Sequence, residues 1–208
     1  MSYSKRFNEK FSKKLLQPSH PINPIRNRAF SFEIIFKLLD KKEDKNFFIV
    51  ETGCMRSDHG EISFGDDGAS TYIFDDFINY YDGQVVSVDI DINNVTHAQK
   101  FVSNKTKIFC SDSVKFLSKL PKDRKIDFLY LDSYDVEREN PHPSQLHHLK
   151  ELCAAIDKLS KGSIVCVDDH DAFFTGGKIG KGNYIKDYMC NIGLKPIYEE
   201  YQIVWVYE

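Results

Sequence analysis

The sequence has little that would direct the chain to a membrane or out of the cell. Its five cysteines are odd in number and widely spaced, with no Cys-x-x-Cys pair, which predicts free thiols. No apolar run approaches the roughly 20 residues of a membrane-spanning helix. The N-terminal segment lacks the apolar stretch of a secretory signal peptide. These absences favour a cytoplasmic protein without a membrane span.

The sequence also lacks an excess of charge of one sign. Lys and Arg number 28 against 31 Asp and Glu, and the two signs are interspersed. Nucleic acid requires a clustered basic surface, so we expect no nucleic-acid partner. Residues 1–30 are the exception, because they form a locally basic arm. Four apolar residues recur in this arm at helical spacing: Phe7, Phe11, Leu15 and Leu16. Their spacing favours packing of the arm against the rest of the chain, and contacts of the arm in a homodimer remain an alternative.

The remaining residues, 31–208, alternate between short apolar runs and helical patterns. Runs at 47–51, 84–89, 107–110, 126–132 and 163–168 are continuous, as buried parallel strands are. The last two runs, 195–200 and 202–208, almost touch in sequence and can pair only antiparallel. The pattern predicts one α/β domain. We expect a doubly wound, mostly parallel seven-stranded sheet with helices on both faces and an antiparallel terminal hairpin.

Each predicted parallel strand ends at or just before an acidic residue: Glu51, Asp89, Asp112, Asp132, and the pair Asp168 and Asp169. A single acid in this place is most often a turn or helix cap, but five in register are not explained that way. Ligands of open α/β sheets bind outside the carboxyl ends of the strands. The acids therefore predict a ligand site at this edge.

The first of these loops argues for a nucleoside without a pyrophosphate. Gly53 directly follows the first strand and would let a ligand approach the backbone. The loop is not G-x-G-x-x-G, so a dinucleotide is poorly supported. Asp89 suits a ribose diol, because one carboxylate accepts hydrogen bonds from both hydroxyls.

Four short stretches together resemble the successive motifs of class I S-adenosylmethionine-dependent methyltransferases, across about residues 45–208: "VETGCMR" (50–56), "VDI" (88–90), "SDS" (111–113) and "LDSYD" (131–135). The sequence departs from that pattern at Met55, where a second glycine is usual. The resemblance implies the Rossmann-like methyltransferase fold with S-adenosyl-L-methionine as cofactor.

The resemblance also implies which residues hold the cofactor. Glu51, Thr52 and Gly53 would face its methionyl part, and Ser70, a candidate helix cap, would lie near its carboxylate. Asp89 would hold the ribose. The adenine would be bordered by Ser111, Asp112 and Ser113.

The acids after the fourth and fifth strands form a second candidate site. Those strands are neighbours in a doubly wound sheet, so Asp132, Asp168 and Asp169 are expected to converge. Converging carboxylates repel one another unless a cation joins them, and oxygen donors suit Mg²⁺ or Mn²⁺. The same three positions resemble the metal-binding acids of the metal-dependent O-methyltransferase branch, which includes catechol, macrocin and cephalosporin-hydroxylase-like members.

Such chemistry needs an aligned acceptor hydroxyl and a base. Methyl transfer from a sulfonium is an in-line displacement, and a divalent ion on the acceptor lowers the pKa of its hydroxyl. His170 is the preferred base, since imidazole titrates near neutral pH, and it could instead be a metal ligand or its partner. Asp135 is the next candidate, with His142 and His147 as weaker ones.

The loop 173–183 bears on the acceptor, because it has four glycines and two lysines directly after the acid cluster. It is either a plain flexible loop or a lid whose Lys178 or Lys181 meets the phosphates of a nucleotide-linked sugar. The polar loops of this edge favour a small polar acceptor of the sugar or nucleotide-linked sugar type.

Three functions follow. The first is a divalent-metal-assisted, S-adenosylmethionine-dependent O-methyltransferase. The second is a metal-dependent hydrolase of carboxyl or phosphate esters that uses the same carboxylates, which leaves Gly53 and Asp89 unexplained. The third is a nucleoside-binding scaffold without catalysis.

Overall fold

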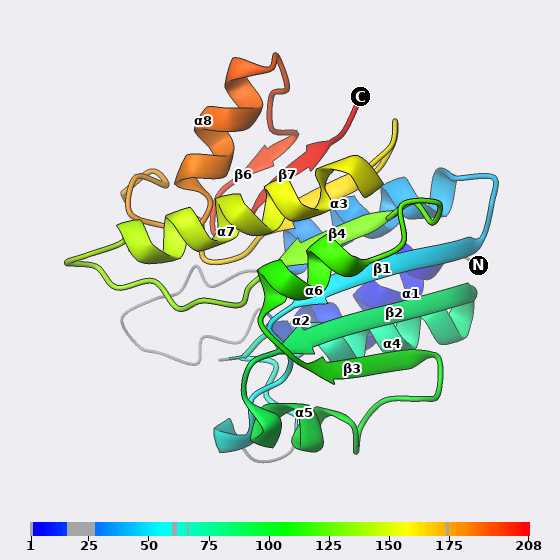
Figure 1. The fold of residues 1–208 in the computed structure, drawn as a ribbon. Coiled ribbons are helices and arrows are strands. Elements are labelled where there is room, and N and C mark those ends of the chain that lie inside the picture. The colour runs from blue at the N-terminus through cyan, green and yellow to red at the C-terminus, as the bar shows by residue number, and fades with distance from the viewer. Residues whose placement is uncertain (1, 16–27, 60–61, 66, 174) are drawn as a thin grey trace.

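A seven-stranded sheet runs through the centre of the molecule, with helices packed on both of its faces (Figure 1). The computed structural model describes residues 2–15, 28–59, 62–65, 67–173 and 175–208. The strand order is β3-β2-β1-β4-β5-β7-β6. The strands are β1 (Asn46–Thr52), β2 (Asp82–Asp89), β3 (Thr106–Cys110), β4 (Phe128–Leu131), β5 (Ile164–Val167), β6 (Tyr198–Glu199) and β7 (Ile203–Val206).

The sheet is parallel over β1 to β5 and reverses at its end. β1 lies between β2 and β4, from the pair Asn46↔Asp82 to the pair Thr52↔Leu131. β7 is antiparallel to β5 and to β6. Only three residues join β6 to β7, and a parallel return needs a dozen or more, so these two strands can pair only antiparallel. The predicted doubly wound seven-stranded sheet with a reversed terminal hairpin is confirmed.

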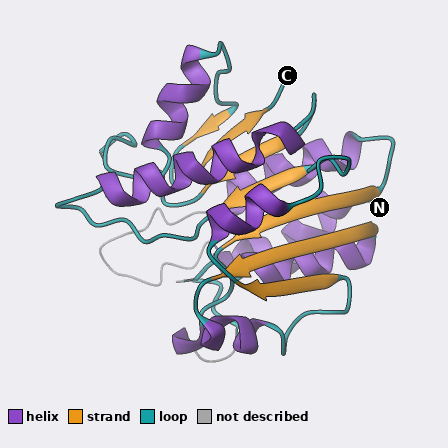
Figure 2. Cartoon of the chain, viewed as in Figure 1, coloured by secondary structure: helices purple, strands orange, loops and turns teal. Residues whose placement is uncertain are grey.

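The helices form two layers, seen in purple in Figure 2. One layer holds α1 (Tyr3–Phe7), α2 (Lys13–Leu15), α3 (Arg28–Lys41) and α4 (Ser70–Tyr80), with a π-helical turn at Asn8–Ser12. The other holds α6 (Ser113–Lys119), α7 (His142–Ala155) and α8 (Asn183–Asn191). α5 (Ile92–Ala98) lies beside β3, and short 3-10 turns occur at Ser57–His59 and Ile156–Lys158. No helix of the described residues is long and apolar enough to cross a membrane.

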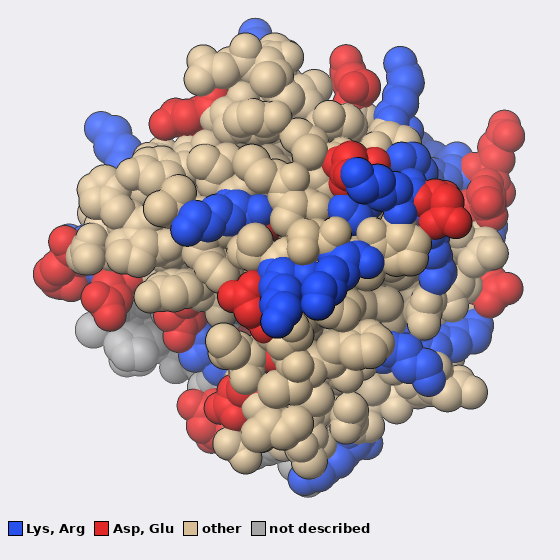
Figure 3. All heavy atoms as spheres, in the orientation of Figure 1, with Lys and Arg blue, Asp and Glu red and all other residues tan. Residues whose placement is uncertain are grey.

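Both faces of the sheet are buried, which explains why the strands read as continuous apolar runs. Phe47 and Ile49 of β1 pack into the core under α3 and α4, whereas Phe48 and Val50 pack into the core under α6, α7 and α8. The alternation follows from the two-residue period of a strand. Charges of both signs are interspersed on the face that Figure 3 draws.

The N-terminal arm is part of the core. Tyr3, Phe7, Phe11 and Leu15 are at most 2% exposed. The ring of Tyr3 meets that of Phe36 edge-on, with centroids 4.8 Å apart, and its hydroxyl donates to the Ile73 carbonyl oxygen at 3.2 Å. The predicted packing of the arm is confirmed for Phe7, Phe11 and Leu15, whereas the predicted Leu16 lies outside the described residues.

A buried carboxylate ties together the ends of β1, β2 and α4. Glu51 accepts hydrogen bonds from the hydroxyls of Ser70 at 2.6 Å, Thr71 at 2.8 Å and Ser87 at 2.6 Å. The sequence predicted Ser70 as the cap of this helix, but its side chain is engaged with Glu51 and does not cap α4. The N-cap position is Ala69, in the left-handed conformation. Burial raises the pKa of Glu51 to about 7, although the three hydroxyls oppose the rise.

Replacing Phe7 by Ala tests the contribution of the arm. We expect the free energy of unfolding to fall by about 3–5 kcal/mol, because the change removes a fully buried ring and leaves a cavity. Urea unfolding measures it. Lys5→Ala, on an exposed position of the same helix, should change stability by less than about 0.5 kcal/mol. Equal effects of the two substitutions would contradict the packing of the arm.

Replacing Glu51 by Gln tests the buried carboxyl. The pKa of Glu51 rises on folding from 4.5 to about 7, so its stabilising contribution is full below pH 4.5 and is lost as the pH rises through about 7. The stability of the wild type relative to Glu51→Gln should therefore fall by about 1–3 kcal/mol over that window. Denaturant unfolding at several pH values measures it, with Glu43→Gln at an exposed site as the control. A difference that does not change with pH would contradict the burial effect.

Candidate functional site

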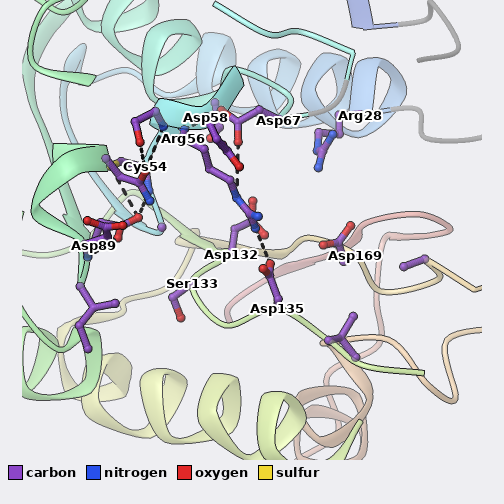
Figure 4. A pocket seen from close by; sticks show the side chains of 18 of the residues that line it. Arg28, Cys54, Arg56, Asp58, Asp67, Asp89, Asp132, Ser133, Asp135 and Asp169 are labelled. Carbon is purple, nitrogen blue, oxygen red and sulfur yellow. Dashed lines mark hydrogen bonds and ion pairs between the residues drawn. The ribbon is translucent and has the colours of Figure 1, made fainter. Parts of the chain in front are cut away.

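A cavity of about 790 Å³ opens at the carboxyl ends of β1, β2, β4 and β5 (Figure 4). This is the edge at which the strand-end acids were predicted to gather. Its lining comes from the ends of these strands and the loops after them, from the first residues of α3 and α4, from α5 and from the turn between β6 and β7: Arg28, Gly53, Cys54, Arg56, Ser57, Asp58, Asp67, Ser70, Asp89, Ile90, Asp91, Asn94, Asp132, Ser133, Asp135, Val136, Asp169, Ala172, Phe173 and Tyr201.

One end of the cavity lies at the end of β2 and is shaped around Asp89. Its Oδ2 accepts from the backbone N–H of Cys54 at 3.1 Å, and its Oδ1 accepts from that of Asp91 at 2.8 Å. The Cys54 thiol also donates to Oδ2, at 3.7 Å, so these bonds fix the carboxylate while Oδ1 keeps a lone pair for a ligand hydroxyl. The neighbouring Ile90 side chain is 77% exposed and offers an apolar surface beside that carboxylate. The arrangement suits a ribose with a flat base next to it.

The loop after β1 passes close to the loop after β4. Gly53 has φ +80°, and a Cβ there would lie 2.6 Å from the Asp132 carbonyl oxygen, so only glycine fits. Thr52 is fully buried, and its hydroxyl accepts from the Asp132 backbone N–H at 3.3 Å. Gly53 lines the cavity, whereas Thr52 holds the two loops together beneath it.

The other end of the cavity lies at the ends of β4 and β5, where the structure brings Asp132, Asp168 and Asp169 together. One oxygen of each carboxylate lies within 4.8 Å of the others. Asp169 has φ +50°, a conformation that Asp tolerates better than most residues, so the chain turns sharply after Asp168. Asp132 and Asp169 line the cavity, and Asp168 is completely buried behind them.

Arg28 pairs with the buried Asp168. The Arg28 Nη2 lies 2.6 Å from Oδ2, and its Nε lies 3.0 Å from Oδ1. Gln202, directly before β7, donates to the same Oδ1 at 2.6 Å. The guanidinium also lies over the ring of Tyr201, at 5.1 Å from its centroid. Both oxygens of Asp168 are thus engaged, in the two-pronged geometry that a guanidinium favours.

Lys181 pairs with the other two carboxylates. Its Nζ lies 2.5 Å from Oδ1 of Asp132 and 3.1 Å from Oδ2 of Asp169, and its side chain is fully buried. Burial alone would lower the pKa of Lys181, but Asp132 and Asp169 raise it above its usual range, so the amine is protonated. The hydroxyl of Tyr201 donates to the remaining oxygen of Asp169. Lys181 is therefore not available to the phosphates of a substrate, which corrects one of the two lysine candidates.

The cluster has the oxygen donors that a divalent ion prefers, but side chains of the protein are already bonded to them. Carboxylate oxygens are the ligands that Mg²⁺ prefers, and the three acids are close enough to share one ion. Arg28 and Lys181 already reduce their charge from −3 to −1, and Asp168 has both oxygens bonded. As arranged, the donor set does not fit a divalent ion.

The two preferred candidates for the base, His170 and Asp135, lie in different places. His170 is 1% exposed and is not among the residues that line the cavity. Its Nε2 lies 3.4 Å from a Glu199 oxygen, and Gly177 and Gly182 pack so closely on its ring that a Cβ on either would clash. Burial lowers the pKa of His170, more than Glu199 raises it. Asp135 lines the cavity and pairs across it with Arg56, as the dashed line in Figure 4 marks.

The remaining predicted cofactor residues divide between the cavity and the surrounding structure. Ser70 lines the cavity and donates its hydroxyl to Glu51, which lies beneath the wall. Ser111, Asp112 and Ser113 are not among the lining residues. Asp112 caps α6 by accepting from the Lys115 backbone N–H at 2.8 Å.

The residues of this site that were not assigned to it from the sequence include Arg28, Arg56, Ile90, Asn94 and, as a partner of the acids, Lys181. Ile90 follows the second strand directly and Asn94 lies in the first turn of the next helix, so their closeness in sequence to Asp89 could have indicated them. Arg28 carries no such signal, because it lies in the basic arm, 140 residues before its partner.

Comparisons with known proteins bear on the fold. No protein-family model matches the chain, and no curated protein is significantly similar to it in sequence. A solved structure of a proposed O-methyltransferase from Klebsiella pneumoniae is similar, with a TM-score of 0.60 and 15% identity over 99% of this chain and 90% of that one.

Two further solved structures are similar. MycE methyltransferase of the mycinamycin biosynthetic pathway, in complex with Mg, S-adenosylhomocysteine (SAH) and mycinamycin VI, has a TM-score of 0.61 and 14% identity over 95% of this chain. This chain spans only 53% of the MycE chain. CalS11, a TDP-rhamnose 3'-O-methyltransferase, has a TM-score of 0.52 and 15% identity over 98% of this chain and 94% of that one. These likenesses show that the chain has the Rossmann-like fold of the class I S-adenosylmethionine-dependent methyltransferases.

Proposed function

We propose that the protein transfers the methyl group of S-adenosyl-L-methionine to a hydroxyl of a small polar acceptor. The observation that carries this proposal is the cavity, which combines a site for a nucleoside with an acidic lining. Asp89 and Ile90 suit the ribose and the adenine, and Gly53 lets the ligand approach the backbone. Ligand cavities of this volume usually hold a molecule of cofactor size.

The charge of the cavity favours a sulfonium. Seven aspartates line it against two arginines. Such a surplus of carboxylates stabilises a cationic ligand and disfavours a diphosphate, in keeping with the missing G-x-G-x-x-G loop. The lining aspartates are Asp58, Asp67, Asp89, Asp91, Asp132, Asp135 and Asp169.

The reaction requires alignment more than activation. The acceptor oxygen attacks the methyl carbon as the carbon–sulfur bond breaks, and the hydroxyl proton passes to a base while SAH forms. The acceptor lies at the end of the cavity formed by Asp132, Asp135 and Asp169. Of the two predicted bases, Asp135 faces this space, so we assign it the proton in preference to His170.

For the substrate class, we propose that the acceptor hydroxyl belongs to a sugar. CalS11, whose name gives TDP-rhamnose as its substrate, supports a sugar, as does the polar lining of the cavity. The surplus of carboxylates argues for a sugar without a diphosphate, so a nucleotide-linked sugar stays a prediction. A homodimer and a cytoplasmic location also stay predictions from the sequence.

A divalent ion, Mg²⁺ or Mn²⁺, stays a prediction as well. Its predicted ligands are Asp132, Asp168 and Asp169, and the role that the sequence predicts for it is to lower the pKa of the acceptor hydroxyl. The Mg in the MycE structure and the convergence of the three acids support it. The ion pairs of Arg28 and Lys181 oppose it. The ester or phosphoester hydrolase considered from the sequence has less support, because it leaves Gly53 and Asp89 of the cavity unexplained.

Titration of SAH by calorimetry tests the cofactor. We expect binding in the micromolar range, and a loss of at least about 10-fold in Asp89→Ala, because a hydrogen-bonded carboxylate would be missing from the ribose site. Asp123→Ala is the matched control, since Asp123 is exposed in the loop before β4, at the opposite edge of the sheet. Absence of binding would contradict the proposed function, and equal binding by Asp89→Ala would contradict the role of Asp89.

A further inference from the structure

The acidic cluster at the ends of β4 and β5 carries its own cation, and the side chain that provides it comes from the loop between β5 and α8. We infer that Lys181 takes the position that a divalent ion would take among Asp132, Asp168 and Asp169, so that the docked lysine and a bound ion exclude one another. Lys181 acts through the two cavity-lining carboxylates that it joins, which makes it a positioning residue.

The contacts of Lys181 are those of a bridging cation. Its Nζ contacts Asp132 and Asp169, which lie at the ends of different strands, and it lies 3.5 Å from the Asp132 carbonyl oxygen. Its backbone N–H donates to the Asp169 carbonyl oxygen at 3.1 Å. The side chain is completely buried, so these contacts replace the hydration of the ammonium.

The loop is built to hold the lysine there. A Cβ on Gly180 would lie 1.6 Å from the His170 carbonyl oxygen, and a Cβ on Gly182 would lie 2.8 Å from the His170 Nδ1. Both neighbours of Lys181 are therefore pressed against the same histidine. The buried amide of Gln145, on α7, donates to the Gly180 carbonyl oxygen at 3.1 Å. The glycines serve this close packing, which accounts for a glycine-rich segment directly after the acids.

Little of the cluster is left for an ion. Within the described part of the chain, five of its six carboxylate oxygens have partners: Lys181 contacts one of Asp132, Arg28 and Gln202 bind both of Asp168, and Tyr201 and Lys181 bind both of Asp169. A divalent ion needs several of these oxygens at once and would meet the lysine charge at contact distance. Removing that charge alone opens two oxygens and restores attraction.

Titration with Mn²⁺ alone, followed by the paramagnetic resonance of the free ion, tests this inference. We expect the wild type to bind Mn²⁺ at least about 100-fold more weakly than Lys181→Met, because the variant lacks the opposing charge. Lys178→Met is the matched control: it changes an exposed lysine of the same loop and should behave as the wild type. No adenosyl ligand is present, so the outcome is independent of the proposed methyl transfer.

A second variant and a second measurement guard against misfolding. The second variant, Lys181→Gln, keeps a hydrogen-bond donor without the charge. In thermal unfolding, Mn²⁺ should raise the midpoints of Lys181→Gln and Lys181→Met and leave the midpoint of the wild type unchanged. Tight binding of Mn²⁺ by the wild type would overturn the inference. So would failure of both Lys181 variants to bind the ion more tightly than the wild type.

Discussion

The buried charge of Asp168 constrains the structure around the cavity. A carboxylate without water needs a partner, and leaving it alone costs several kcal/mol. Its partners are Arg28 at the start of α3 and Gln202 directly before β7, and Lys181, before α8, pairs with the neighbouring acids. Both helix layers and the antiparallel end of the sheet must therefore be in place before this carboxylate is satisfied. The same contacts fix Asp132 and Asp169 at the cavity wall.

The N-terminal arm belongs to the same construction. Its aromatic side chains fill the layer between α3 and α4, and Arg6 pairs with Asp76 on α4 at 2.8 Å. α3 thus has a packed neighbour along its length, and Arg28 at its first residue is held where it reaches across the sheet edge to Asp168. A segment that is basic in sequence contributes mainly apolar side chains to the structure, because its lysines face outward while Tyr3, Phe7 and Phe11 face inward.

The sequence was sufficient for the sheet and for the edge that carries the cavity. Continuous apolar runs ending at Glu51, Asp89 and Asp132 indicated parallel strands, and the sheet topology then placed their ends together. Side-chain direction was harder to predict. Glu51 turns into a set of three hydroxyls, and the left-handed Asp169 separates His170 from the cavity. Arg28 and Asp168 lie 140 residues apart, and no local periodicity reports such a pair.

That separation has a consequence for biosynthesis. A ribosome adds about 5–20 residues per second, so Arg28 emerges on the order of ten seconds before Asp168, and Gln202 follows last. During this interval α3 cannot seat its guanidinium, and the unfinished sheet exposes the strand edge that β5 will cover. The nascent chain is committed to its final packing only when β7 has left the ribosome. Until then the apolar layers of the growing chain stay partly uncovered and prone to aggregation.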